Sequence, residues 1–303
     1  TKGLLHLGTY EVAFEILGTV AIKREEFTSA IIFYLINILQ SKDFDSSVKD
    51  GMVTLLRIII LKEPLRVNSQ HLAYLEKALK LVTQAALSQD RHSYRNFQSI
   101  MGIFTVIAAI AEKNPQLIRP RTVGSLKTCM ETEGLDYWVY SMALSPFEQI
   151  AQKRPELFNP AAVSTLLSLL KNKYSMGGVT VGVANTLSQL ARRKPQLITQ
   201  EIVSALEGAL ELERLEYSVY KAVGSALASI AINISEFTSL IFSDLEYRIK
   251  TSSGSMAQRI LTKDAYPAAV SVLSEIARNK SGFTLRAVNA LEALLKTSDF
   301  MRE

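Results

Sequence analysis

Apolar residues recur along this chain with a period close to 40 residues. The phrase Ile-Ala-x-x-x-Pro-Gln-Leu-Ile begins at Ile110, and related phrases begin at Ile150 and Leu190. The second residue of each phrase is an alanine, and these alanines are 40 residues apart. Weaker copies extend the series, so that seven such positions, here called anchors, lie at residues 21, 60, 111, 151, 191, 231 and 277. A fixed period of this length is typical of repeat proteins.

The residues before each anchor predict an amphipathic helix. The positions four and eight residues before the anchors are all apolar: Leu17, Leu56, Ile107, Phe147, Leu187, Leu227 and Leu273, and Ala13, Met52, Ile103, Ala143, Val183, Val223 and Ala269. Steps of three and four residues mark one face of an α-helix. We therefore expect a helix, here called helix B, to end near each anchor. The proline that lies four residues after the central anchors is expected to stop it.

A second helix, here called helix A, is expected after each connection. Apolar residues recur at helical spacing in segments such as 163–170. Asn159 precedes Pro160 and is expected to cap one helix A, and Thr199 is expected to cap the next. A pair of helices of about 40 residues cannot bury its apolar face alone. We therefore expect the pairs to stack into a single elongated domain over residues 1–303.

The repeat resembles that of the HEAT family. Asp45, Val48 and Lys49 are similar to the aspartate, valine and basic residue of the HEAT motif, and the Ile-Ala or Leu-Ala ending is also similar. Other repeats open with the sequences at 135–137 and 215–217, which leaves an armadillo-like repeat open as an alternative. The resemblance implies an all-α fold, a right-handed α-α superhelix (HEAT/ARM-like solenoid) of about seven two-helix repeats.

The pattern departs from a strict period in two repeats and at its ends. Between the anchors at 60 and 111, the extra length predicts either a longer helix over residues 71–88 or a longer loop near residues 89–92. Between the anchors at 231 and 277, residues 251–255 are expected to form a loop. Residues 1–9 and 296–300 match connections between a helix A and a helix B, so we expect the chain to be part of a longer array.

The composition is that of a folded protein without a membrane span. The chain is 48% hydrophobic and 21% charged, and its formal net charge is +5. The apolar run at 31–40 is followed by polar residues and is shorter than the roughly 20 residues that a membrane helix needs. The single cysteine, Cys129, has no partner for a disulfide, which favours a reducing compartment. We expect a cytoplasmic location.

No catalytic or metal-binding motif stands out in the sequence. His6, His71 and His92 are scattered and have no second ligand at helical spacing, so neither a metal nor a cofactor is expected. Cys129 lies in an apolar stretch and is expected to be a buried structural thiol. The glycine-rich segment 177–182 lacks the lysine of a phosphate-binding loop and is expected to form a turn. These features predict a protein that is not an enzyme and has no small-molecule substrate.

Basic residues follow most of the anchors. They are Lys23, Arg24, Lys62, Lys113, Lys153, Arg154, Arg192, Arg193, Lys194, Arg278 and Lys280. Because successive connections stack, these side chains are expected to line one edge of the solenoid, where they could bind phosphates or an acidic peptide. The alternative is that they only complement the C-terminal ends of the helices, where positive charge is stabilising.

Aromatic residues near the start of the B helices form a second candidate surface. Tyr10, Tyr140, Tyr220 and Tyr266 each lie eleven residues before an anchor and are expected to pack, with their hydroxyl groups at the rim. Trp138 lies off the apolar stripe; an exposed tryptophan there would anchor a contact, and burial in the core is the alternative. In the same helix, Pro146 is expected to cause a kink.

The leading functional hypothesis is a non-enzymatic scaffold or adaptor that binds a protein or an extended peptide on the solenoid surface. The candidate partner-binding residues are Trp138, Tyr137, Tyr217, Lys153, Arg154, Arg192, Arg193 and Lys194. A nucleic-acid-binding solenoid that uses the basic edge is the alternative. The resemblance also allows a HEAT-like enzyme, because some HEAT-like proteins are lyases or glycosylases.

Overall fold

The computed structural model describes residues 7–41, 46–87, 93–172, 177–210, 216–252 and 266–299. In these ranges the chain forms fourteen α-helices joined by turns and short 3-10 helices, and it contains no strand there. None of the helices in these ranges is long and apolar enough to cross a membrane. The chain divides into two compact units, Thr1–Phe158 and Asn159–Glu303, which are described separately. That residues 1–303 act as one domain stays a prediction.

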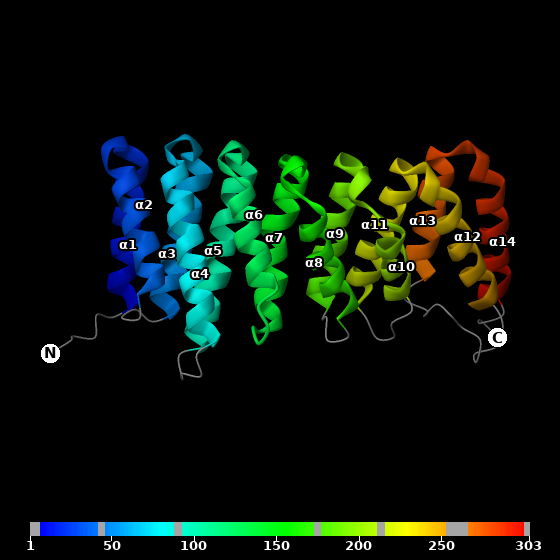
Figure 1. The fold of residues 1–303 in the computed structure, drawn as a ribbon, viewed down its shortest axis with the longest axis horizontal. Coiled ribbons are helices and arrows are strands. Elements are labelled where there is room, and N and C mark those ends of the chain that lie inside the picture. The colour runs from blue at the N-terminus through cyan, green and yellow to red at the C-terminus, as the bar shows by residue number, and fades with distance from the viewer. Residues whose placement is uncertain are drawn as a thin grey trace. The chain divides into compact units, whose positions relative to one another are not determined.

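The first unit alternates B and A helices as predicted. Its B helices are α1 (Leu7–Lys23), α3 (Ser46–Lys62), α5 (Ser93–Lys113) and α7 (Tyr137–Lys153), and its A helices are α2 (Glu25–Gln40), α4 (Ser69–Leu87) and α6 (Pro120–Met130). Consecutive B helices pack on one another, as do consecutive A helices, from blue α1 to green α7 (Figure 1). The unit therefore has two layers, one of B helices and one of A helices.

The second unit repeats this arrangement. Its B helices are α9 (Gly177–Arg193), α11 (Tyr217–Asn233) and α13 (Tyr266–Asn279), and its A helices are α8 (Pro160–Lys171), α10 (Gln200–Ala209), α12 (Ser235–Ser252) and α14 (Thr284–Asp299). Helix α11 packs between α9 and α13, and the A helices contact one another in chain order. The predicted order of a helix B followed by a helix A is thus confirmed in both units.

The predicted apolar face of the B helices forms the core. In α3, α5, α7, α9, α11 and α13, the residues four and eight before the anchor are at most 3% exposed. In α1 the equivalent residues are less buried, since Leu17 is half-buried and Ala13 is exposed. The B helices approach closely: a Cβ added to Gly224 in α11 would lie 3.3 Å from the Cβ and the carbonyl oxygen of Ala268 in α13. Only a small residue fits at such a crossing.

Proline stops four of the B helices, as the sequence predicts. A 3-10 helix begins at each of these prolines: η1 (Pro64–Arg66), η2 (Pro115–Leu117), η3 (Pro155–Leu157) and η4 (Pro195–Leu197). The residue seven positions after the anchor is then apolar and buried, namely Val67, Ile118, Phe158 and Ile198. These connections are closed by apolar packing.

In the connections that lack this proline, the residue seven positions after the anchor is a threonine. Thr28 Oγ1 donates a hydrogen bond to the carbonyl oxygen of Ala21 over 2.7 Å, and Thr238 Oγ1 donates to that of Ala231 over 2.6 Å. Thr284 makes the same bond to Ala277 over 3.3 Å. The carbonyls at the end of a helix have no partner within it, and the hydroxyl group supplies a donor. These connections are closed by hydrogen bonding.

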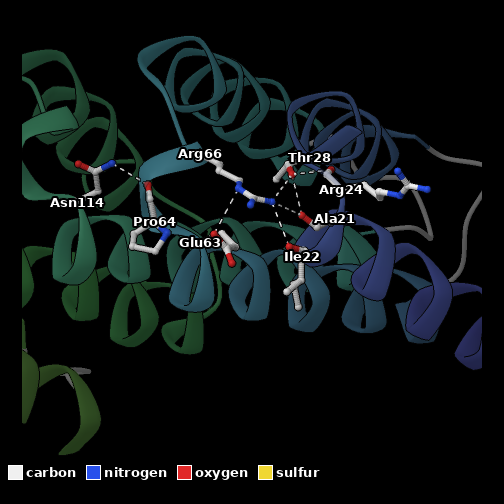
Figure 2. Close-up of polar contacts among 8 residues, drawn as sticks. All are labelled: Ala21, Ile22, Arg24, Thr28, Glu63, Pro64, Arg66 and Asn114. Carbon is white, nitrogen blue, oxygen red and sulfur yellow. Dashed lines mark hydrogen bonds and ion pairs between the residues drawn. The ribbon is translucent and has the colours of Figure 1, made fainter. Parts of the chain in front are cut away.

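Side chains of one connection also bind the connection before it. Asn114 Nδ2 donates to the carbonyl oxygen of Pro64 over 2.9 Å. Arg66 Nη1 donates to the carbonyl oxygen of Ala21 and to Thr28 Oγ1, each over 3.1 Å, and Figure 2 shows both bonds. The repeats of the first unit are therefore joined by polar contacts at this edge as well as by their core.

The structure confirms one expected cap and corrects two local expectations. Asn159 Oδ1 accepts a hydrogen bond from the backbone N–H of Ala162 over 2.9 Å, so Asn159 caps α8. Thr199 makes no capping bond, and Glu201 instead places an acidic group in the first turn of α10. The glycine-rich segment 177–182 begins helix α9 rather than a turn. Its apolar side chains face the core, and this packing overrides the low helix propensity of glycine.

Both longer repeats contain a long helix A. Helix α4 has 19 residues, whereas α6 has 11, so the first of the two alternatives is confirmed. Residues 88–92 lie outside the described part. A loop was expected at residues 251–255, but residues 251 and 252 are the last two of helix α12. Residues 253–255 lie outside the described part. Helix α7 runs unbroken through the buried Pro146.

We expect the threonine connections to depend on their buried hydroxyl groups. Replacing Thr238 by valine keeps the shape of the side chain but leaves a buried carbonyl without this donor. The Thr238→Val variant should lose about 1–3 kcal/mol of unfolding free energy in urea titrations. Thr284→Val is the matched control, because Thr284 occupies the same register position but is exposed. Equal losses in the two variants would contradict this account.

Candidate functional site

The candidate residues lie at opposite ends of the B helices. Tyr137 and Trp138 are the first two residues of α7, and Lys153 is its last. Fifteen residues at 1.5 Å each separate Trp138 from Lys153 by roughly 22 Å along the helix. Likewise, Tyr217 begins α11, and Arg193 ends the neighbouring α9. Each unit therefore presents an aromatic surface at one end of its B helices and a basic surface at the other.

The Trp138 side chain is exposed, in agreement with the first of the two alternatives. It is 56% exposed, and its ring centroid lies 4.7 Å from that of Tyr137, with the two rings tilted by 36°. The backbone N–H of Trp138 donates to Asp136 Oδ1 over 2.9 Å, which caps α7. The two rings together form an apolar surface at the start of the helix.

The loop before α7 holds this aromatic pair in place. Gly134 has a φ of 84°, a conformation that favours glycine. Tyr140 donates its phenolic O–H to the carbonyl oxygen of Thr132 over 2.6 Å, and burial raises the pKa of this phenol. Leu135 is buried next to the cap. The backbone at the start of α7, where Trp138 lies, is therefore held by a turn, a cap and the hydrogen bond of Tyr140.

The other aromatic candidates differ from one another. Tyr217 is 56% exposed, whereas Tyr220 is 1% exposed and packs in the core as expected. Tyr140 is half-buried and keeps its hydroxyl group at the rim, as predicted. The side chains of Tyr10 and Tyr266 lie outside the described part.

Arg154 serves the fold, whereas Lys153 faces solvent. Arg154 Nη1 donates to the carbonyl oxygens of Pro115 over 3.0 Å and Ile118 over 3.4 Å, the register positions that Asn114 binds one repeat earlier. Its Nε atom pairs with Glu156. Lys153 is exposed and forms no ion pair within the described residues.

The basic edge of the first unit is partly neutralised. Of its six residues, three pair with nearby carboxylates, in the pairs Arg24–Glu26, Lys113–Glu112 and Arg154–Glu156. Arg66, which lies in the same connections, pairs with Glu63. Exposed pairs of this kind contribute little to stability, but each cancels a positive charge. The edge is therefore a row of separated charges and not a continuous basic stripe.

A polar groove lies at the C-terminal ends of the B helices in the second unit. Its volume is about 460 Å³, and it is lined by Arg192, Arg193, Ser229, Ile232, Asn233, Glu275 and Asn279. Two of the sequence candidates, Arg192 and Arg193, belong to it. Lys194 follows them directly and is half-buried. We call this site the α9–α13 groove.

Arg192 is oriented by a buried serine pair. Its Nε and Nη2 atoms donate to Ser229 Oγ over 3.2 and 3.0 Å. Ser229 Oγ also lies 2.8 Å from Ser188 Oγ, and both serines are buried. The sequence did not single out these serines, because their role depends on the packing of α9 against α11.

Two asparagines complete the groove. Asn233 Nδ2 donates to the carbonyl oxygen of Ser229 over 2.7 Å, and Asn279 Nδ2 donates to that of Glu275 over 2.8 Å. Both lie two residues after an anchor, which is the position of Arg193 in α9. This shared register is the signal in the sequence that could have identified them.

The buried cysteine and histidine have structural environments. Burial raises the pKa of the Cys129 thiol to about 11. His71 is buried, its Nε2 atom lies 2.9 Å from Ser29 Oγ, and its Nδ1 atom accepts from the backbone N–H of Asn68. Burial also lowers the pKa of His71. His6 and His92 lie outside the described part, and the residues inside it contain no group of three metal-binding side chains.

The fold is similar to that of the karyopherins, which are HEAT-repeat solenoids. Kap121p bound to Pho4p matches with a TM-score of 0.63 and 14% identity, over 94% of this chain and 30% of that chain. Kap121p bound to RanGTP matches with a TM-score of 0.63 and 14% identity, over 95% of this chain and 30% of that chain. Kap95p in its RanGDP structure matches with a TM-score of 0.59 and 14% identity, over 97% of this chain and 44% of that chain.

These similarities confirm the predicted fold. The chain is an all-α solenoid of the HEAT type. It spans less than half the length of the three matched chains, and at such identity the likeness concerns the fold alone. No protein-family model matches the sequence, and no curated protein matches it either.

We expect substitutions at Arg154 and Lys153 to separate a structural role from a surface role. Arg154→Gln removes a donor to two backbone carbonyls and should lower the free energy of unfolding by about 1 kcal/mol. Lys153→Gln should change it by less than about 0.5 kcal/mol, because this side chain is exposed. Urea unfolding of both variants measures the difference, and a larger loss for Lys153→Gln would refute the assignment.

We also expect Cys129 to be unreactive in the folded protein. Its pKa of about 11, against an ordinary value of 9.0, leaves about a hundredfold less thiolate at pH 8 than in the unfolded chain. Alkylation by iodoacetamide at pH 8 should therefore be at least about a hundredfold slower in buffer than in urea. The protonated thiol also stabilises the fold below pH 9, and this contribution should be lost as the pH rises from 9 to about 11. Rapid alkylation of the folded chain would contradict both expectations.

Proposed function

We propose that this chain is a non-enzymatic scaffold that binds a protein or an extended peptide on the exposed ends of its B helices. The observation that carries this proposal is the aromatic pair of Tyr137 and Trp138. Trp138 is 56% exposed, and its backbone N–H is bound by the cap at the start of α7. A solvent-exposed tryptophan is costly to keep in water and gains from contact with a partner.

The energetics of binding favour such a residue as an anchor. Tryptophan and tyrosine are enriched among the residues that dominate interface energies. The turn at Gly134 and the hydrogen bond from Tyr140 already restrict this region. A partner therefore has less conformational entropy to remove when it binds, which raises the affinity.

The fold supports the same class of function. Solenoids present extended surfaces, because each repeat contacts only its neighbours. Kap121p, which has a similar fold, has been solved bound to Pho4p, to Nup53p and to RanGTP. By analogy with this fold, we propose a macromolecular partner for the present chain and no chemical step.

The alternative of a nucleic-acid-binding solenoid has less support. The basic edge was its basis, and in the first unit three of the six residues of that edge are paired with carboxylates. Nucleic-acid binding draws its affinity from many phosphate contacts, which a partly neutralised edge supplies poorly. The cytoplasmic location stays a prediction from the single cysteine.

We expect Trp138→Ala to weaken partner binding strongly. Loss of a central aromatic anchor costs about 2 kcal/mol or more, which is roughly a thirtyfold loss of affinity. Partner capture by the wild-type chain and by the variant, read by quantitative mass spectrometry, measures this loss. Tyr34→Ala is the matched control, because Tyr34 is also 56% exposed but lies in helix α2 of the A layer.

The chain offers a direct readout of this contact. Trp138 is the only tryptophan of the sequence, so the intrinsic tryptophan fluorescence reports on this site alone. Binding of the captured partner should shift the emission to shorter wavelengths as the indole leaves water. Unchanged emission on binding, together with equal capture by Trp138→Ala and Tyr34→Ala, would rule out this surface.

A further inference from the structure

We infer that the α9–α13 groove binds an acidic segment of a partner protein, with a carboxylate of that segment held by Arg192 and Arg193. This inference rests on the proposed binding function and specifies the chemistry of the partner at the second unit. The groove has the size of a site for a few side chains, with a volume of about 460 Å³. It is open at the ends of three B helices, so an extended segment can cross it.

Arg192 is already arranged to receive an anion. Two of its N–H groups donate to Ser229 Oγ, which the hydrogen bond with Ser188 holds in place. The serine hydroxyl group is neutral, so it fixes the guanidinium plane without cancelling its charge. The remaining N–H groups can donate to a carboxylate, for which the planar guanidinium is well suited.

Arg192 and Arg193 differ from Arg24, Lys113 and Arg154 of the first unit, which are paired with carboxylates. The residue directly after the anchor is the acidic Glu112 in α5 but the basic Arg192 in α9. The residue five positions after the anchor is Glu156 in the connection after α7 but the neutral Gln196 in the connection after α9. Among the described residues, neither Arg192 nor Arg193 forms an ion pair. Positive charge is therefore concentrated at the α9 side of the groove, where an acidic side chain would be attracted.

Glu275 and the two asparagines define the other side of the groove. Among the described residues that line it, Glu275 is the only acidic one, so the groove has a basic side on α9 and an acidic residue on α13. Asn233 and Asn279 turn their Nδ2 atoms back to their own helices, and their Oδ1 atoms can then accept hydrogen bonds from the main chain of a bound segment.

The same features favour a peptide over a nucleic acid. Glu275 would repel a continuous phosphate backbone, whereas a peptide can place a carboxylate on one side only. Single-stranded nucleic acids also bind through base stacking on aromatic residues. The part of the groove lining that the structure describes contains no aromatic residue, and the exposed Tyr217 lies at the opposite end of α11, roughly 24 Å away along the helix.

The test uses the full chain and a fluorescein-labelled peptide of eight glutamates, with binding followed by fluorescence anisotropy. Wild-type protein should bind this peptide saturably, and the affinity should fall as salt is added. Arg193→Gln should weaken binding by about fivefold to tenfold, because it removes a charge-assisted contact. Glu275→Gln should strengthen binding, because it removes a repulsive charge. Lys221→Gln, which removes a positive charge from an exposed position of α11, should leave binding within about twofold.

Several results would overturn the inference. They are the absence of saturable binding to the wild-type chain, equal effects of Arg193→Gln and Lys221→Gln, and weaker binding by Glu275→Gln. Tighter binding of an eight-residue oligothymidine, lost in Arg193→Gln, would assign the groove to nucleic acid instead. Thermal unfolding checks that each variant is folded, and the opposite signs expected for Arg193→Gln and Glu275→Gln cannot both arise from misfolding.

The outcome for the groove can be separated from that for the proposed function. Partner capture that depends on Trp138 tests the scaffold role in the first unit without using the groove. If Trp138→Ala loses the partner and the octaglutamate peptide does not bind the wild-type chain, the scaffold role is supported and the groove inference is wrong. If the peptide binds as expected and Trp138→Ala captures the partner as well as the wild type does, the groove inference is supported and the role of the aromatic surface is wrong.

Discussion

The close packing of neighbouring B helices is the constraint on which the rest of this structure depends. In all the B helices but α1, the residues four and eight positions before the anchor are buried, and neighbouring B helices within each unit pack on one another. Close crossings such as that at Gly224 leave little space, so a shift of register by one residue would place side chains where backbone now lies. Because this register is set in every repeat, equivalent residues recur at equivalent places. Both candidate surfaces result from this regularity, because the ends of the B helices are the parts that the packing leaves open.

The connections solve one physical problem in two ways. The end of a helix B leaves carbonyl groups without partners, and the chain must turn at once into helix A. Four connections use proline and a buried apolar residue, and three use a threonine that donates to the anchor carbonyl. In the first unit, Arg66, Asn114 and Arg154 then join three of the connections to the ones before them. Part of the basic edge is therefore structural, and its positive charges cannot be counted as a binding surface without examining their contacts.

The two candidate surfaces are suited to different interactions. The surface of Tyr137 and Trp138 is apolar and held by local hydrogen bonds, so it contributes through the burial of aromatic area. The α9–α13 groove is polar and holds an oriented guanidinium, so it contributes through charge and direction. The first surface would therefore select for apolar groups and the second for acidic groups.

The sequence by itself determined the repeat, the order of the helices, their apolar face and the positions where proline stops them. These features depend on local periodicity and backbone chemistry, which are written directly in the residue order. The exposed Trp138 was also visible there as an aromatic residue off the apolar stripe. Only the tertiary structure decided that Arg154 binds the backbone of the preceding repeat, that segment 177–182 is helical, and that Ser229 orients Arg192. Each of these depends on contacts between residues about 40 positions apart, and a single sequence does not show which side chains the packing of adjacent repeats brings together.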